Sequence, residues 1–344
     1  MSDVQSTVAT PLLVPTSTRL GAVHIAVTDA ERALAIWRDV VGLTLISRDD
    51  DRLELGAGGK GLVVLHTGAT GPVTPHTIGL YHVAVHVPTR RDFARTLNRA
   101  IAARVRVSPT DHLVSEALYF WDFDGNGIEI TFETPWRGRF VENDELMAMT
   151  ADGRPHSGRE PIDVPGLMAE LDGDETPFAP MPEGTRIGHV HVHVDDLDTA
   201  MGFYRDQLGF AGQLLSRRYG MGDVNLDYAP HILAFNIWAG RNPSMPPAGV
   251  AGLRWFTIVV PDEGTLSEVR VRLEGAGSPV EAIEGGIETR DPAGNRVRIV
   301  IGDWARRSAA HPSPPTPLPQ GERGAPLTAL ELLPKRCKGL PFSP

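Results

Sequence analysis

The chain has almost no cysteine, because Cys337 is the only one among its 344 residues. Neither a disulfide framework nor a thiolate metal site can organise the fold, so any metal must be held by nitrogen and oxygen. No stretch approaches the roughly 18 apolar residues that a membrane-spanning helix needs. The N-terminus also lacks a basic region followed by an apolar core, and we expect a cytoplasmic protein without a membrane partner.

Basic residues and nucleotide-binding motifs are also scarce. The 33 Lys and Arg residues are outnumbered by 43 Asp and Glu, and the net charge of −10 opposes nucleic acid as a partner. The sequence contains no Gly-rich phosphate loop and no serine nucleophile motif, which argues against nucleotide chemistry and nucleophilic hydrolysis. Its composition, 41% hydrophobic and 22% charged, is that of a globular protein long enough for two cores.

What the chain does contain is a pattern that repeats. The run Arg-Ile-Gly-His-Val-His-Val-His-Val from Arg186 aligns with Arg-Leu-Gly-Ala-Val-His-Ile-Ala-Val from Arg19. The strand-like run that begins at Gly79 recurs at Gly252. Each copy predicts a strand, a helix and a meander of strands (βαβββ), which indicates an α+β fold. Four such units follow in series, at about 20–66, 79–133, 187–240 and 252–302.

The units divide the chain into segments. Residues 1–18 and 304–344 are polar or Pro-rich without periodicity, and we expect a disordered arm and a disordered tail there. Residues 134–184 have the character of a linker, with one short helix near Val164–Leu171. The units then form two halves, the first over residues 19–133 and the second over residues 185–303.

Unit two places chemically useful side chains at both ends of one small folding unit. Its first strand alternates so that His82 and His86 share one face and the valines the other, which is typical of a half-buried strand. A helix is predicted over residues 90–103, and an Asp-Gly-Asn-Gly turn precedes a strand that carries Glu129. We therefore expect His82 and Glu129 to point into one concave surface.

Ligand types for a divalent cation are concentrated in the middle two units. Unit two offers His82 in its first strand and Glu129 in its last, and unit three offers His189 in its first strand. Two imidazoles and one carboxylate on adjacent positions of an octahedron leave three positions open, the arrangement of non-haem Fe(II) sites. His231, on a later strand of unit three, would stand beside the metal as an acid or base, since an imidazole pKa of about 6.5 suits proton transfer near neutrality.

Units one and four differ at these positions. They hold Ala22, Trp255 and Arg298, none of which suits a divalent cation. His191 and His193, on the strand face of unit three, strengthen the metal hypothesis because a buried polar row is costly unless it binds something. A lone strand histidine is nevertheless usually a packing residue, so structural or substrate-lining roles stay open for His24, His66, His86 and His112.

At these residues the chain resembles the vicinal oxygen chelate superfamily, which contains glyoxalases, bleomycin resistance proteins and extradiol dioxygenases. The fourfold unit, the Gly-His-Val-His start of unit three and the Asp-Gly-Asn-Gly-Ile-Glu turn carry the resemblance. Within the superfamily, three segments are similar to two-domain catechol 2,3-dioxygenase-like proteins: Gly79-Leu-Tyr-His82, His112 to Tyr119, and Asn236-Ile-Trp-Ala-Gly240.

The resemblance implies four βαβββ modules that pair into two open-barrel domains of the metal-chelating type. It also implies Fe(II) as the cofactor, with Mn(II) or another divalent metal as the alternative. The expected reaction is extradiol cleavage of a small aromatic diol by O2. We expect substrate contacts from Tyr81, His112, Tyr119, His191 and Trp238, with Trp255 as a further aromatic wall.

One departure from the family bears on how the units pair. In well-studied extradiol enzymes all three ligands come from the second half, at positions that here hold His189, Trp255 and Arg298. Either the metal has been lost, or unit two pairs with unit three and unit one with unit four. We favour the second hypothesis, because it gathers His82, Glu129 and His189 in one barrel and leaves the other inert. It requires His82 and His189 to lie within about 10 Å of each other.

Two other functions stay open at this point. A metal-dependent isomerase, epimerase or lyase acting on a hydroxy-ketone would use the same ligands. A non-catalytic, bleomycin-resistance-like protein would sequester a ligand in the same cavity and need no metal. The intact set of His82, Glu129 and His189 favours catalysis. The sequence does not decide whether the chain forms a homo-oligomer.

Overall fold

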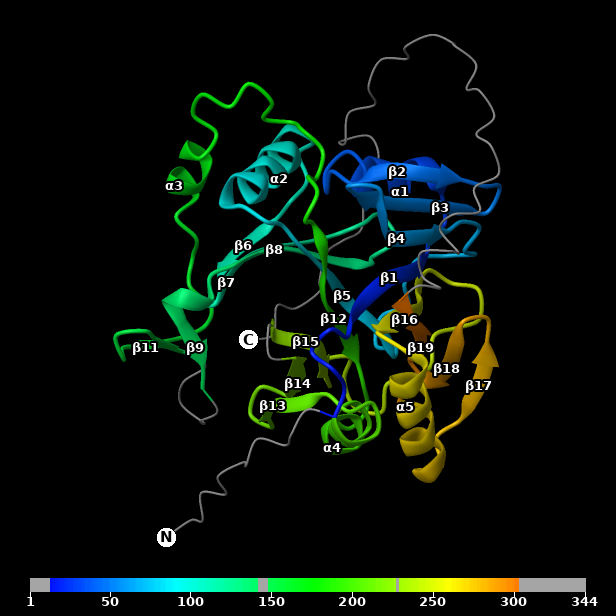
Figure 1. The fold of residues 1–344 in the computed structure, drawn as a ribbon. Helices are drawn as coiled ribbons and strands as arrows, with labels where there is room; N and C mark the ends of the chain where they lie inside the picture. The colour runs from blue at the N-terminus through cyan, green and yellow to red at the C-terminus, as the bar shows by residue number, and fades with distance from the viewer. Residues whose placement is uncertain (1–12, 142–147, 227–228, 303–344) are drawn as a thin grey trace.

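The computed structural model describes residues 13–141, 148–226 and 229–302. Within these ranges the four units follow one another in the predicted order of strand, helix and strands (Figure 1). No helix in the described ranges is long and apolar enough to cross a membrane.

The elements of the first two units and the linker are bounded as follows. Unit one comprises β1 (Arg19–Ala26), α1 (Ala30–Trp37), β2 (Thr44–Arg48), β3 (Arg52–Ala57) and β4 (Lys60–His66). Unit two comprises β5 (Gly79–His86), α2 (Arg90–Ala102), β6 (Ser108–Asp111), β7 (Ser115–Trp121) and β8 (Gly127–Glu133). The linker carries η1 (Pro135–Arg137), β9 (Gly138–Phe140), β10 (Ala148–Thr150), β11 (Pro155–His156) and α3 (Val164–Ala169).

The last two units repeat the same order. Unit three comprises β12 (Arg186–His193), α4 (Leu197–Met201), the π-helical turn η2 (Gly202–Gln207), β13 (Ala211–Ser216), β14 (Met221–Leu226) and β15 (Ala229–Asn236). Unit four comprises β16 (Gly252–Val260), α5 (Glu263–Gly275), β17 (Val280–Ile283), β18 (Gly286–Arg290) and β19 (Arg296–Ile301).

The units pair into two eight-stranded sheets. Units four and one form the outer-unit sheet, in the order β17-β18-β19-β16-β1-β4-β3-β2. Units three and two form the inner-unit sheet, in the order β13-β14-β15-β12-β5-β8-β7-β6, which lies beside the first on the left of Figure 1. An antiparallel pair, β1 with β16 or β5 with β12, joins the units at the centre of each sheet. Each sheet therefore takes strands from both halves of the chain.

This topology confirms the α+β class and the paired open-barrel architecture. It also confirms the hypothesis that unit two pairs with unit three and unit one with unit four. The order of the strands explains why the pairing matters for a site. It places β5 between β12 and β8, so that side chains from units two and three share one face of one sheet.

Strand β5 is buried on both faces, and the prediction of a half-buried strand is wrong in this respect. Val83 and Val85 belong to the hydrophobic core, as the alternation predicts. The opposite face, which carries His82 and His86, is also covered, and these two residues are only 5% and 6% exposed. Side chains of neighbouring strands fill that concave face, as in a small barrel whose interior is occupied by side chains.

Two buried hydrogen bonds tie the sheets together at equivalent points of the repeats. Trp37 Nε1, at the end of α1, donates to Asp122 Oδ2 at 3.2 Å, and Tyr204 OH, in η2, donates to Asp291 Oδ2 at 2.8 Å. Units one and two belong to different sheets, and so do units three and four. Each of the two hydrogen bonds therefore connects one sheet to the other. The aspartates that open these two turns, Asp122 before Asp-Gly-Asn-Gly and Asp291 in unit four, therefore also anchor one sheet to the other.

The linker contains more structure than the sequence predicts. A short helix, α3, lies where one was predicted, but β9, β10 and β11 also form a three-stranded sheet. A backbone bridge between Asp111 and Glu160 then fixes the following segment beside unit two. Strands of two or three residues carry no readable alternation, which explains why the pattern did not reveal them.

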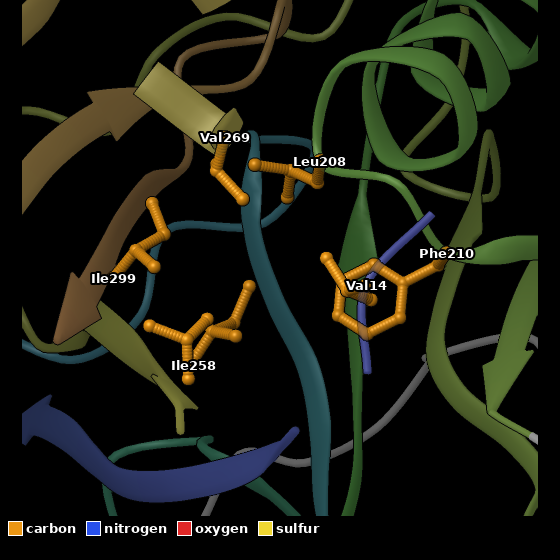
Figure 2. Close-up of a pocket in the computed structure, with 7 residues that line it drawn as sticks. Val14, Leu208, Phe210, Ile258, Val269 and Ile299 are labelled. Atoms are coloured by element: carbon orange, nitrogen blue, oxygen red, sulfur yellow. The ribbon is translucent and has the colours of Figure 1, made fainter. Parts of the chain in front are cut away.

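Part of the predicted N-terminal arm is packed against the protein. Val14 is 4% exposed and lines a narrow apolar gap with Leu208, Phe210 and Ile258 (Figure 2). The gap leaves no room for a water molecule, so it is part of the core and not a ligand site. The predicted disorder of residues 1–12 and 304–344 falls outside the described residues.

Candidate metal centre

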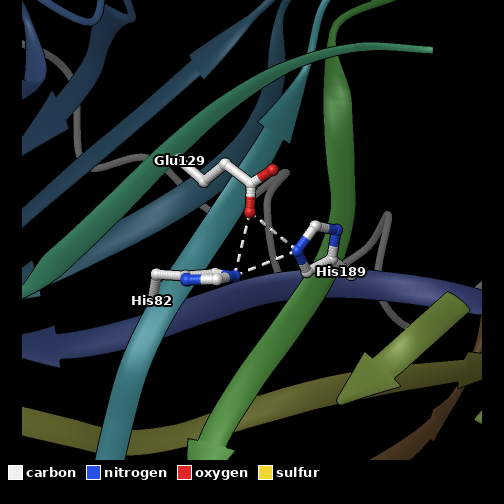
Figure 3. Close-up of side chains that lie close together, drawn as sticks. All are labelled: His82, Glu129 and His189. Atoms are coloured by element: carbon white, nitrogen blue, oxygen red, sulfur yellow. Dashed lines mark hydrogen bonds and ion pairs between the residues drawn. The ribbon is translucent and has the colours of Figure 1, made fainter. Parts of the chain in front are cut away.

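Three neighbouring strands bring His82, Glu129 and His189 together. Ala84 of β5 pairs with His189 of β12 on one side and with Glu129 of β8 on the other. His82 lies two residues before Ala84 and therefore projects from the same face of β5. The small side chain of Ala84 leaves the space into which the three larger ones converge. We call these three residues the donor cluster (Figure 3).

The donor atoms form a nearly equilateral triangle. His82 Nε2 lies 2.9 Å from Glu129 Oε2, His189 Nε2 lies 3.0 Å from the same oxygen, and the two Nε2 atoms are 3.0 Å apart (Figure 3). For metal–ligand bonds of about 2.1 Å, neighbouring corners of an octahedron lie ~3.0 Å apart and corners of a tetrahedron ~3.4 Å apart. The triangle therefore fits one face of an octahedron better than it fits a tetrahedral zinc site.

Burial keeps the donor cluster in the protonation states that bind a cation. All three residues are at most 5% exposed, and burial lowers the pKa of His82 and of His189, so both imidazoles are neutral near pH 7. Burial alone would raise the pKa of Glu129, but His189 and His82 hold it well below its ordinary value. Thr131 donates to Glu129 Oε1 at 2.9 Å, which leaves Oε2 directed at the imidazoles. Converging lone pairs of this kind fit a divalent cation.

His231 lies beside the donor cluster, where the sequence predicts an acid or base. Its ring centroid is 4.3 Å from that of His189, and its side chain is 22% exposed. His231 Nδ1 has no hydrogen-bond partner among the described residues and lies 3.9 Å from Asp223 Oδ2. Burial, with the nearby His189, lowers the pKa of His231 well below its ordinary value, so the ring is neutral near pH 7.

Tyr119 and His112 form a hydrogen-bonded pair on the unit-two side of the cluster. The Tyr119 ring centroid lies 5.5 Å from that of His82. His112 Nδ1 lies 2.6 Å from the Gly158 carbonyl oxygen of the linker, and only an N–H can donate to that oxygen. The neutral ring therefore accepts at Nε2, 2.8 Å from the Tyr119 hydroxyl, which donates to it. The Tyr119 oxygen keeps its lone pairs for other partners.

Aromatic side chains gather on the opposite side of the cluster. The Tyr81 ring centroid is 5.0 Å from that of His82 and 5.1 Å from that of Trp238. Trp238 is 37% exposed, so this side opens toward solvent. The expectation that Trp255 also lines the site is wrong, because it belongs to the outer-unit sheet and stacks on His24 at 4.1 Å.

Only one histidine of the row on β12 faces the other donors. His191 Nε2 accepts from Asn236 Nδ2 at 2.8 Å, and His193 Nδ1 donates to Asn236 Oδ1 at 2.8 Å. A single buried asparagine thus satisfies both histidines, which explains how the polar row is tolerated without three metal bonds. In the sequence, Asn236 stands in the Asn-Ile-Trp-Ala-Gly motif at the end of a predicted strand, and this position was a usable signal.

The outer-unit sheet has no equivalent cluster among the described residues. The only group of His, Cys, Asp and Glu donors found in the described ranges is that of His82, Glu129 and His189. In the outer-unit sheet His24 Nδ1 and His66 Nε2 bond each other at 3.0 Å, which satisfies both rings at these atoms. The structure therefore supports one metal centre, in the inner-unit sheet.

Comparisons with known proteins agree with this fold. A family model described as the Glyoxalase/Bleomycin resistance protein/Dioxygenase superfamily matches residues 19–132. A protein of Bacillus subtilis (strain 168) named catechol-2,3-dioxygenase is 35% identical over 293 residues, which cover 83% of this chain and 98% of that protein.

Solved structures of lower identity share the fold. A provisionally assigned dioxygenase from Bacillus subtilis superposes with a TM-score of 0.57 at 12% identity, over 82% of this chain and 84% of its own. A glyoxalase I variant from Zea mays superposes with a TM-score of 0.52 at 14% identity, over 86% of this chain and 97% of its own. At these identities the likeness concerns architecture and not chemistry.

Proposed function

The chain belongs to the glyoxalase/bleomycin resistance protein/dioxygenase superfamily, and from this premise we propose that it is an Fe(II)-dependent extradiol dioxygenase. Its substrates would be a catechol-type aromatic diol and O2. The observation that carries the proposal is the donor triangle, whose edges of 2.9 to 3.0 Å match one octahedral face. The name of the Bacillus subtilis relative supports the same reaction class.

His82, Glu129 and His189 would hold the iron. Two neutral imidazoles and one carboxylate suit a ferrous ion, and they also accept Mn(II), which makes manganese the alternative metal. When bound, the ion would supply adjacent open positions for the diol and for O2 and a path for electron density between them. The side chains around the cluster would orient the substrate and exchange its protons.

His231 is the residue that we propose as proton acceptor for the diol. Its ring lies against His189, it is neutral near pH 7, and its Nδ1 has no hydrogen-bond partner among the described residues. General-base assistance of this kind contributes about 10²- to 10⁴-fold to a rate. His231 could return the proton when the ring has opened, because the same nitrogen then acts as an acid.

The remaining side chains would orient the substrate. Tyr81 and Trp238 present an aromatic edge and face on the open side of the cluster, and His191 supports both. On the other side the Tyr119 hydroxyl, which donates to His112, can accept a hydrogen bond from a substrate hydroxyl. A flat diol between these two walls would meet the metal position with both oxygens.

An anaerobic purification followed by metal analysis and addition of catechol tests the proposal. We expect one iron per chain and a yellow ring-fission product when oxygen is admitted. Bound metal without any colour from a panel of catechols would favour an isomerase, epimerase or lyase of a hydroxy-ketone. A protein that binds no divalent metal would favour a sequestering protein, and either result would overturn the proposal.

A further inference from the structure

A fourth histidine touches the donor cluster from behind. His86 Nε2 lies 3.3 Å from His189 Nδ1, and the His86 side chain is 7% exposed. His189 directs its other nitrogen, Nε2, at Glu129 and His82. The one ring nitrogen of His189 that does not face the donor cluster therefore faces His86.

The hydrogen-bond roles along this contact follow from the ligand role of His189. A ring that binds a metal through Nε2 keeps its proton on Nδ1, so His189 donates and His86 Nε2 accepts. The neutral His86 ring then carries its own proton on Nδ1, which lies 3.4 Å from Glu133 Oε1, an electrostatic contact without hydrogen-bond alignment. Arg186 Nη2 donates to Glu133 Oε2 at 2.6 Å. His189, His86, Glu133 and Arg186 therefore lie in series, with hydrogen bonds at the first and last steps and an electrostatic contact between His86 and Glu133.

Glu133 is well suited to end this series as an anion. Burial alone would raise its pKa, but the neighbouring His86 and Arg186 hold the pKa of Glu133 at about 2. A charged carboxylate behind a histidine favours the tautomer with the proton on the facing nitrogen. The negative charge of Glu133, 3.4 Å from His86 Nδ1, therefore favours electrostatically the form of His86 whose Nε2 is free to accept from His189.

Gly188 provides independent evidence that the strand is built around the His86 ring. A Cβ atom placed on Gly188 would lie 1.8 Å from His86 Cδ2 and 2.0 Å from His86 Nε2. The backbone of Gly188 has no positive φ, so conformational freedom is not the reason for a glycine there. The register of β12 against β5 also shifts between Ile187 and His189. Only a residue without a side chain lets the imidazole lie against the strand and reach His189.

We propose that His86, backed by Glu133, is a positioning residue that holds His189 as an Nε2 ligand. This inference rests on the metal centre of the proposed function but does not depend on ring cleavage. The sequence alone left structural and substrate-lining roles open for His86. Outer-shell partners of this kind typically change metal affinity by about 10- to 100-fold when they are removed.

A matched pair of substitutions tests the proposal. His86→Leu keeps a side chain of similar size without an acceptor, whereas His86→Gln keeps an acceptor near the position of Nε2. We expect Co(II), measured by competition with a chromogenic chelator, to bind about 10- to 100-fold more weakly to His86→Leu and within about threefold of wild type to His86→Gln. The visible absorption of bound Co(II) should change in His86→Leu and be restored in His86→Gln.

Two further variants keep the test decisive. His66→Leu removes a partly buried histidine from the outer-unit sheet and should leave Co(II) affinity unchanged. Glu133→Gln replaces the anion without touching His86 and should weaken Co(II) binding by about 3- to 10-fold, even if His86→Leu does not fold. Equal affinities of wild type, His86→Leu and Glu133→Gln would overturn this inference alone. Wild-type protein that binds no divalent cation would overturn both the inference and the proposed function.

Discussion

The guanidinium carbon of Arg298 lies 3.7 Å from the centroid of the Trp255 ring. In the repeat, these two residues stand where the inner-unit sheet has Glu129 and His82. Arg298 Nε also donates to Glu288 Oε2 at 2.7 Å. The outer-unit sheet therefore carries a fixed cation of its own at the ligand positions. A second cation would be repelled there, and we expect the protein to bind one metal and not two.

The first prediction compares the two equivalent positions. Glu129→Ala should lower metal affinity by at least ~100-fold, because it removes a ligand and the only negative charge of the donor cluster. Arg298→Ala should leave metal content unchanged and lower the free energy of unfolding by about 1–2 kcal/mol, because it removes a cation–π contact and a partner of Glu288. Metal analysis and urea unfolding of both variants provide the measurements. Equal metal loss in both would contradict the assignment of the donor cluster.

The second prediction concerns the bond that joins the sheets at Tyr204. Tyr204→Phe should lower the free energy of unfolding by about 1–2 kcal/mol, because Asp291 Oδ2 loses a buried hydroxyl donor. Tyr219→Phe is the matched control, since Tyr219 is only partly buried and lies in a turn, and it should stay within about 0.5 kcal/mol of wild type. Urea denaturation followed by far-UV circular dichroism measures both. Identical midpoints would argue that this bond does not hold the sheets together.

Much of the architecture and the donor set could be predicted from the sequence because both depend on local patterns. The alternation of His82 with the core valines predicted which side chains share one face of β5. The repeat then showed which residue types occupy equivalent positions in the four units. The decisive step was the pairing of units. Glu129 and His189 are far apart in sequence, and only a pairing of units two and three explains why the scarce ligand types fall in neighbouring units.

What could not be predicted depends on register and on irregular segments. The contact of His86 with His189 requires the register shift at Gly188, and a single sequence does not reveal where a strand bulges. The carbonyl of Gly158 reaches His112 from a linker whose strands are too short to show a period. Trp255 was wrongly predicted to line the site because it is aromatic. The pairing of unit four with unit one places it in the other sheet.

The third prediction follows from the buried His24 of the outer-unit sheet. Burial, reinforced by His66 and Arg298, lowers the pKa of His24 to about 2, whereas an unfolded chain has an imidazole pKa of about 6.5. The unfolded chain therefore takes up a proton below about pH 6.5 and the folded protein does not. This group contributes its full stability above pH 7 and loses it as the pH falls, by about 1.4 kcal/mol per unit below 6.5.

The measurement compares wild type with His24→Phe, both freed of metal so that the donor cluster behaves alike. Between pH 7.5 and 5.5 the wild-type free energy of unfolding should fall by about 1.4 kcal/mol more than that of the variant. The variant will start from a lower value, because the bond to His66 is gone. The difference in slope is the readout, and parallel slopes would mean that His24 is not held neutral by its surroundings.

The last prediction separates proton transfer from metal binding. His231→Gln should reduce kcat with catechol by about 10²- to 10⁴-fold, because amide nitrogen cannot accept the proton that an imidazole takes. Iron content should stay that of wild type, since His231 packs against the His189 ring and is not one of the converging donors. His66→Gln, in the outer-unit sheet, serves as the control and should keep full activity. If His231→Gln loses iron together with activity, His231 supports the donor cluster and is not the proton acceptor. If the variant keeps full activity, the proton acceptor is instead the Tyr119–His112 pair, whose hydroxyl and ring nitrogen lie 2.8 Å apart.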